Sequence, residues 1–253
     1  MSEAAPTPEG KRPTLAALYR ASQKPSDSLF NRFLARPLAT LLLPALLRSP
    51  LTPNQLTFIG LTLMVGATAS LAFVSGVTGL WVGVALLELS YVIDCCDGQL
   101  ARLKNMSSPV GGALDFMIDE LKAYLLIGAL GARWFLETRE VEALWVALLS
   151  LIVFASAISL TKFTRSEVYC AAVGRRPVAD GSAAGERQGR WWPLRALLRL
   201  ITQYPASFPL FALFGLDGLR AFLYSYGALH LLYAGQRFLE ILLQLARPSR
   251  DSG

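Results

Sequence analysis

Long runs of apolar residues alternate with short polar segments along most of the chain. A bilayer core about 30 Å thick needs roughly 20 helical residues, because each residue adds about 1.5 Å to a helix. Six runs reach or approach this length, and we expect each to form a transmembrane helix. They lie at about 54–75, 78–100, 110–136, 141–167, 194–215 and 220–244.

A shorter apolar segment, LFNRFLARPLATLLLPALLRSP, precedes the first of these runs. Its apolar part after Arg36 is interrupted by two prolines and ends at Arg48, so it is too short to cross a bilayer. Arg32 and Arg36 lie one helical turn apart, with apolar side chains beside them. This pattern predicts an N-terminal amphipathic helix over residues 28–48 that lies in the membrane interface.

Composition supports the same class of protein. Of the 253 residues, 53% are hydrophobic and 17% are charged, and the mean hydropathy is +0.43. A soluble domain carries about 25% charged residues. We therefore predict an all-α integral membrane protein with six transmembrane helices behind the interfacial helix. Its three cysteines have neither a disulfide framework nor a zinc-binding spacing.

The two ends of the chain are polar. Residues 1–27 lack the apolar core of a signal peptide, and we expect a disordered cytosolic tail there. Residues 28–245 then form the membrane domain, and residues 246–253 form a second short tail.

Positive charge is concentrated in two places, before the first predicted span and between the fourth and fifth. The connection between the first two spans, SGVTG, carries no charge, and the connection after the third span mixes both signs. This asymmetry predicts that both termini lie in the cytoplasm. We expect a multi-pass protein of the bacterial inner (plasma) membrane. The net charge of +6 therefore indicates a lipid bilayer, and not a nucleic acid, as the partner.

Four aspartates occur in the stretch DCCDGQLARLKNMSSPVGGALDFMIDE. Asp94 and Asp97 are three residues apart, and Asp115 and Asp119 are four apart, so each pair shares a helix face. The short connection between the second and third spans makes these helices neighbours, and the two pairs can converge at the cytoplasmic face. Four ionised carboxylates would repel one another, which predicts a site for Mg2+ or Mn2+, with room for two ions that clamp a phosphate.

Small residues and an arginine accompany the aspartates. Gly98 and Ala101 lie on the face of Asp94 and Asp97 and leave space for a ligand against the backbone. Arg102 can offer its planar guanidinium to a diphosphate. Gly111 lies one turn before Asp115, where a side chain would obstruct the cleft.

These eight residues, spread over 26 positions from Asp94 to Asp119, resemble the signature of the CDP-alcohol phosphotransferases. The segment TPNQLT at the start of the first span and the helix-plus-six-span layout are also similar to that family. The resemblance implies transfer of a substituted phosphate from a CDP-linked donor to an alcohol acceptor, with release of CMP. It also implies a cytoplasmic active site and a homodimer.

The resemblance further implies roles for individual residues. Asp94, Asp97 and Asp115 would bind the metal ions, and Asp119 would accept the proton of the acceptor hydroxyl and contact one ion. The CDP moiety would be contacted by residues around the signature, namely Asn54, Thr57, Gly98, Ala101, Arg102, Ser108 and Gly111.

The acceptor site is less defined. Ser159, Lys162 and Arg165 lie close to one face at the end of the fourth span and are similar to residues that bind a phosphorylated acceptor in some family members. The alternative is that Lys162 and Arg165 only mark the cytoplasmic end of the span.

The donor is also open. CDP-diacylglycerol is favoured because a lipid can enter a membrane-surface site sideways, and the product would then be a phospholipid. Transfer from CDP-inositol to inositol phosphate is the second candidate, and a CDP-choline or CDP-ethanolamine donor is the third. The aspartates also leave open three other classes, namely a diphosphate-binding prenyltransferase, a cation-coupled transporter and a protein with the fold but without turnover.

Two further charged residues lie inside the spans. Glu88 and Lys122 are expected at similar depths in the second and third spans, where they would form a buried ion pair or face different neighbours. Lys122 also shares a face with Asp119 and can reach toward the acceptor cavity.

Overall fold

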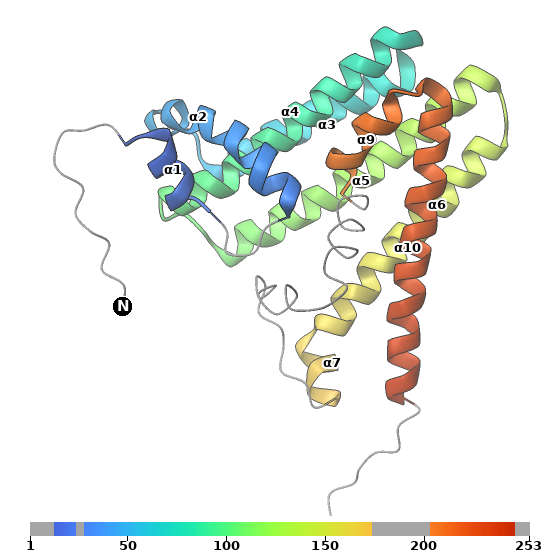
Figure 1. Ribbon diagram of the computed structural model, residues 1–253. Coiled ribbons are helices and arrows are strands. Elements are labelled where there is room, and N and C mark those ends of the chain that lie inside the picture. Colours follow the sequence, from blue (N-terminus) through green and yellow to red (C-terminus); the bar gives the residue numbers. More distant parts are fainter. Residues whose placement is uncertain (1–12, 24–27, 174–202, 246–253) are drawn as a thin grey trace, which may run out of the picture.

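Helices account for all the regular structure that the computed structural model describes, which covers residues 13–23, 28–173 and 203–245. Figure 1 shows the arrangement of these helices. In chain order they are α1 (Leu15–Ala21), the π-helix η1 (Asn31–Ala35), α2 (Arg36–Arg48), α3 (Pro53–Phe73), α4 (Gly76–Leu103), α5 (Pro109–Thr138), α6 (Glu142–Arg165), α7 (Glu167–Ala172), α9 (Tyr204–Ala212) and α10 (Gly215–Leu245).

Three of the described helices, α3, α4 and α6, are long and apolar enough to cross a membrane by length and composition. Helices α5 and α10 are longer still, but they carry more polar and charged residues. The described part of the chain is therefore all-helical with membrane-spanning character, and six spans remain a prediction. The predicted span 194–215 begins outside the described residues, and α9 is the helix that the structure places within it.

Helix α5 connects two groups of helices. On one side, α3 packs against both α4 and α5, and α2 packs against α4. On the other side, α6 packs against α5 and α10, and Figure 1 shows α6 and α10 side by side. Helix α9 contacts α10 and α4, so it joins the two groups.

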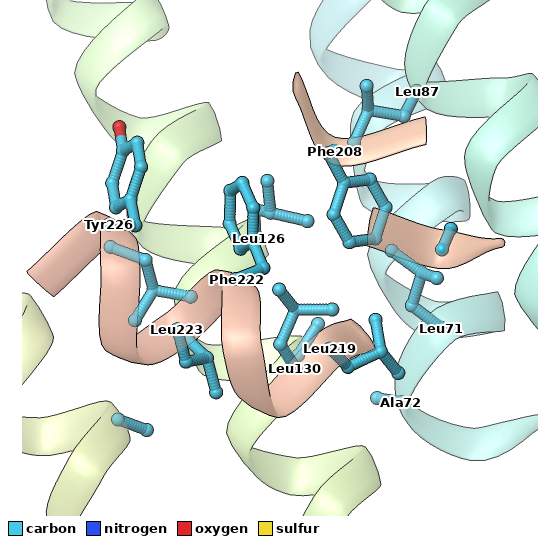
Figure 2. Close-up of a cluster of buried hydrophobic side chains, with 14 of the residues drawn as sticks. Leu71, Ala72, Leu87, Leu126, Leu130, Phe208, Leu219, Phe222, Leu223 and Tyr226 are labelled. Carbon is cyan, nitrogen blue, oxygen red and sulfur yellow. The ribbon is translucent and has the colours of Figure 1, made fainter. Parts of the chain in front are cut away.

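The apolar core lies where these helices meet (Figure 2). Phe208 of α9 and Phe222 of α10 pack edge to face with ring centres 5.2 Å apart. Leu71 of α3 and Leu126 of α5 complete this layer, and all four side chains are buried. Because α9 contributes Phe208, the C-terminal part of the chain is anchored to the first spans.

Glycines let two pairs of helices approach closely. A Cβ atom on Gly83 of α4 would lie 2.5 Å from Leu71 of α3. A Cβ atom on Gly131 of α5 would lie 2.4 Å from Ala147 of α6. Real atoms do not approach so closely, so any larger residue at either position would push the helices apart.

The N-terminal segment differs from the expectation of a disordered tail over residues 1–27. Residues within it form α1, which Thr14 caps through a hydrogen bond from the Ala17 N–H. Leu18 and Ser22 are buried, and Ser22 is bonded to polar groups of α4. Burial of these side chains, which composition alone does not reveal, is the reason that this part is ordered. Residues 1–12 and 24–27 lie outside the described residues.

The segment 28–48 is helical as expected, over η1 and α2. Tyr91 of α4 donates a hydrogen bond to Asn31 Oδ1 at 2.5 Å and fixes η1 against α4. Helix α2 packs against α4 and exposes Leu38 and Leu41. Its location in a membrane interface stays a prediction.

Arg133 is a buried cation inside α5. Its guanidinium donates hydrogen bonds to the carbonyl oxygens of Leu71, Val74 and Gly76 at 2.8–3.2 Å. It also pairs with Glu137 at 2.9 Å. Arg133 therefore caps the end of α3 and holds the turn to α4.

Replacing Arg133 with Met is expected to lower the melting temperature of the detergent-solubilised protein by roughly 6–20 °C, because breaking a buried charged network costs about 3–5 kcal/mol. Arg139→Asn is the matched control, since Arg139 is exposed and has a left-handed backbone that Asn tolerates. Equal melting temperatures for the two variants would contradict this role of Arg133.

Candidate metal and nucleotide site

Three carboxylates meet where α4 ends and α5 begins. Asp94, Asp97 and Asp115 each offer an oxygen, and these oxygens lie within 4.8 Å of one another. The two helices are joined by the short turn 104–108, which places Asp115 beside the aspartates of α4. The predicted convergence is confirmed for these three residues. Carboxylate oxygens suit a hard cation such as Mg2+, and their mutual repulsion favours one, so the donor set fits a divalent metal.

Thr57 of α3 holds one of these carboxylates in place. Its hydroxyl donates a hydrogen bond to Asp97 Oδ2 at 2.7 Å, and both residues are buried. Helix α3 is itself fixed at its start by a capping box between Thr52 and Gln55. Thr57 was expected to contact CDP, and the structure shows that it orients a predicted metal ligand.

Lys122 lies among the aspartates. Its ammonium forms an ion pair with Asp94 and lies 3.7 Å from Asp119 Oδ1. The structure thus pairs Lys122 with Asp94 and not with Glu88, whose Oε1 is buried without a hydrogen-bond partner among the described residues. The sequence indicated only that Lys122 lies three residues after Asp119 on the same helix face, and so near the aspartates.

Asp119 is placed differently from the other three aspartates. The metal-type cluster contains Asp94, Asp97 and Asp115, whereas Asp119 lies at its edge with 51% of its side chain exposed. It is therefore the signature carboxylate most open to a substrate.

Three of the expected CDP-binding residues come together at the start of α5. Ser108 caps this helix by accepting the Gly111 N–H at 3.0 Å. A Cβ atom on Gly111 would lie 3.1 Å from Ser108 Oγ and 3.5 Å from Asn54 Oδ1. Gly111 thus lies against the polar side chains of Ser108 and Asn54, and a larger residue there would crowd them.

Gly98, Ala101 and Arg102 lie on the last turns of α4. The Arg102 guanidinium lies over Gly98: a Cβ atom on Gly98 would be 3.5 Å from Arg102 Nη1. Arg102 Nε donates to the carbonyl of Ser22 at 2.7 Å, so the N-terminal segment takes part in orienting this arginine. Gln99, on the same turn, is fully buried and donates to Ser22 Oγ at 3.1 Å. Sequence reasoning missed this contact, since Ser22 lies in the segment expected to be disordered.

The acceptor candidates lie on α6. Lys162 reaches α5, where its ammonium is 3.4 Å from Glu120 Oε1 and 3.7 Å from the centre of the Phe116 ring. It thus contacts the residue next to Asp119. Ser159 and Arg165 are exposed, and in the described part of the chain no hydrogen bond or ion pair joins them to Lys162.

Replacing Thr57 with Val is expected to weaken Mn2+ binding by about 10–100-fold, as for other residues that hydrogen-bond to a metal ligand. Valine keeps the shape of threonine but removes the hydrogen bond to Asp97. Isothermal titration with Mn2+ measures the effect, and Thr62→Val is the control, because Thr62 is exposed on the same helix. Unchanged affinity in Thr57→Val would show that the hydrogen bond from Thr57 to Asp97 does not support metal binding.

Comparison with known proteins agrees with this geometry. The family model for CDP-alcohol phosphatidyltransferase matches residues 50–182, which include all eight signature residues. Three curated relatives share the name bifunctional IPC transferase and DIPP synthase. The protein of Rubrobacter xylanophilus is 37% identical over 89 residues, which cover 34% of this chain and 20% of that protein.

The relative from Archaeoglobus fulgidus is 32% identical over 124 residues, covering 48% of this chain and 24% of that protein. The relative from Thermococcus kodakarensis is 32% identical over 114 residues, covering 45% and 25%. The chain thus matches a quarter or less of the length of each relative. On the family match, which covers the carboxylate cluster and the helices that build it, this chain belongs to the CDP-alcohol phosphatidyltransferase family.

Proposed function

We propose that this protein transfers a substituted phosphate from a CDP-linked donor to the hydroxyl of an acceptor and releases CMP. The observation that carries the proposal is the meeting of Asp94, Asp97 and Asp115 within 4.8 Å at the junction of α4 and α5. The family match supports the same reaction class. In this proposal the membrane-spanning helices keep the site at the cytoplasmic surface of the membrane.

In this proposal Asp94, Asp97 and Asp115 hold two Mg2+ or Mn2+ ions, with Asp119 as a further ligand at the edge. When bound, the cations would neutralise charge on the diphosphate of the donor. Asn54, Ser108 and Gly111 would contact part of the CDP moiety, and Arg102 would contact its phosphates. Ser22 and Gln99 support the proposed role of Arg102, because their hydrogen bonds restrain the end of α4.

Asp119 is proposed as the general base. Its carboxylate takes the proton of the acceptor hydroxyl, whose oxygen forms a bond to the β-phosphorus of the donor. The bond between the β-phosphorus and the bridging oxygen breaks, and CMP leaves with that oxygen. The half-exposed side chain of Asp119 suits this role, because a base must reach a substrate that enters from outside the cluster.

We further propose CDP-diacylglycerol as the donor, with a phospholipid as the product. The apolar helices beside the site support it, since a lipid donor can approach through the bilayer. A second candidate is transfer from CDP-inositol to inositol phosphate. Lys162 favours this alternative, because a cation beside Glu120 and next to Asp119 can attract a phosphorylated acceptor. None of the three relatives is named as a phospholipid synthase.

A panel assay of the purified protein with Mg2+ separates the candidates. The donors are CDP-diacylglycerol and CDP-inositol, and the acceptors are inositol phosphate, glycerol phosphate, inositol, serine and glycerol. We expect CMP release with CDP-diacylglycerol and one acceptor. Release with CDP-inositol alone would replace the phospholipid proposal with the second candidate, and release with neither donor would contradict both.

Asp119→Asn is expected to lower CMP release at least about 1,000-fold while the affinity for CDP changes less than about threefold, because the amide cannot accept the proton but the clustered carboxylates remain. Asp97→Ala should abolish metal-dependent CDP binding as well. The control is Asp217→Asn on α10, whose side chain is 87% exposed. Substantial turnover by Asp119→Asn would show that another group is the base.

A further inference from the structure

Lys122 is the largest fully buried charged residue in the described part of the chain. Only 1% of its surface is exposed, and it lies in α5 beyond Asp119. Burying an ammonium group is costly unless a carboxylate compensates for the lost water. The ion pair with Asp94 provides that compensation and fixes the ammonium at the carboxylate cluster.

The Asp94 carboxylate takes part in two charged interactions. Asp94 supplies an oxygen to the cluster with Asp97 and Asp115, and it also pairs with Lys122. An ammonium and a divalent cation at one carboxylate repel each other, and the repulsion is strong because Asp94 is only 11% exposed. Lys122 and a metal ion therefore compete for the negative charge of Asp94.

Helices α3 and α4 surround the Lys122 ammonium together with α5. A Cβ atom on Gly60 of α3 would lie 3.6 Å from Lys122 Nζ and 3.4 Å from the carbonyl oxygen of Ser90 in α4. Ser90 donates a hydrogen bond to the Gly60 carbonyl at 2.6 Å, which joins α3 to α4 at this level. The lysine head is thus enclosed by three helices, and only 2% of its side chain is exposed.

The ammonium has a second carboxylate within reach. Asp119 Oδ1 lies 3.7 Å from Lys122 Nζ, on the same helix face. If a cation occupied Asp94, a small change in the lysine rotamer would bring the ammonium closer to Asp119. The positive charge would then remain compensated without leaving its enclosure.

We propose that Lys122 is an internal counter-ion that opposes divalent cation binding at Asp94, so that the site binds the cation tightly only when a nucleoside diphosphate adds its negative charge. Metal and nucleotide binding are then coupled, and each raises the affinity for the other by the same factor. The inference rests on the proposed function for the identity of the anion, which is the diphosphate of the donor.

The test is Mn2+ binding to the detergent-solubilised full chain, measured by titration calorimetry with and without CDP. In the unsubstituted protein, CDP should raise the Mn2+ affinity at least about tenfold. In Lys122→Met the affinity without CDP should be at least about tenfold higher than in the unsubstituted protein, and the effect of CDP should shrink. Lys122→Arg should behave like the unsubstituted protein, since it keeps the charge.

Lys104→Met is the matched control, because it also removes one lysine charge but Lys104 donates to the carbonyls of Ser49 and Leu51, away from the cluster. Its Mn2+ affinity should be unchanged. If Lys122→Met does not fold, Lys122→Gln and the CDP dependence of the unsubstituted protein provide the test. Mn2+ binding that is unaffected by CDP, or that weakens when Lys122 is replaced, would overturn the inference.

These outcomes are distinct from those of the proposed function. CDP-coupled Mn2+ binding without CMP release from any donor would contradict the proposed reaction and leave the counter-ion role supported. CMP release from a protein whose Mn2+ affinity does not respond to Lys122→Met would support the reaction and overturn the counter-ion role.

Discussion

Repulsion among carboxylates at the junction of α4 and α5 is the constraint on which the rest of this structure depends. Asp94, Asp97 and Asp115 lie within 4.8 Å of one another, and Asp97 is buried. Like charges in such surroundings destabilise the fold unless cations or hydrogen bonds compensate for them. Thr57 donates a hydrogen bond to Asp97, and the Lys122 ammonium pairs with Asp94. The three clustered carboxylate oxygens are ligands that suit a divalent cation.

Close contact among α3, α4 and α5 makes this compensation possible. Thr57 can reach Asp97, and the Lys122 ammonium can lie against Gly60, only because the three helices pack closely together. At the other end of α3, Arg133 bonds to three backbone carbonyls and holds the turn to α4. The α3–α4 contact thus extends from Gly83 and Leu71 to the hydrogen bond between Thr57 and Asp97 at the charged site.

The edge of the site differs from its interior. Asp119 is half exposed, and Lys162 of α6 lies beside Glu120, the next residue of α5. The N-terminal segment closes another side, where Ser22 accepts a hydrogen bond from Arg102. This division suits the proposed reaction, because bound ions need a protected cluster while the acceptor needs an accessible base.

Much of this site follows from the sequence alone. The spacing of Asp94, Asp97 and Asp115 determines which helix faces they occupy, and the short turn 104–108 brings those faces together, so their convergence was predictable. The apolar runs likewise determined an all-helical, membrane-type protein. Tertiary structure alone decided that Lys122 pairs with Asp94 and that the Ser22 carbonyl accepts a hydrogen bond from Arg102. Helical periodicity sets the direction of a side chain from its own axis, whereas the partner of a long, rotatable side chain depends on how closely the helices pack.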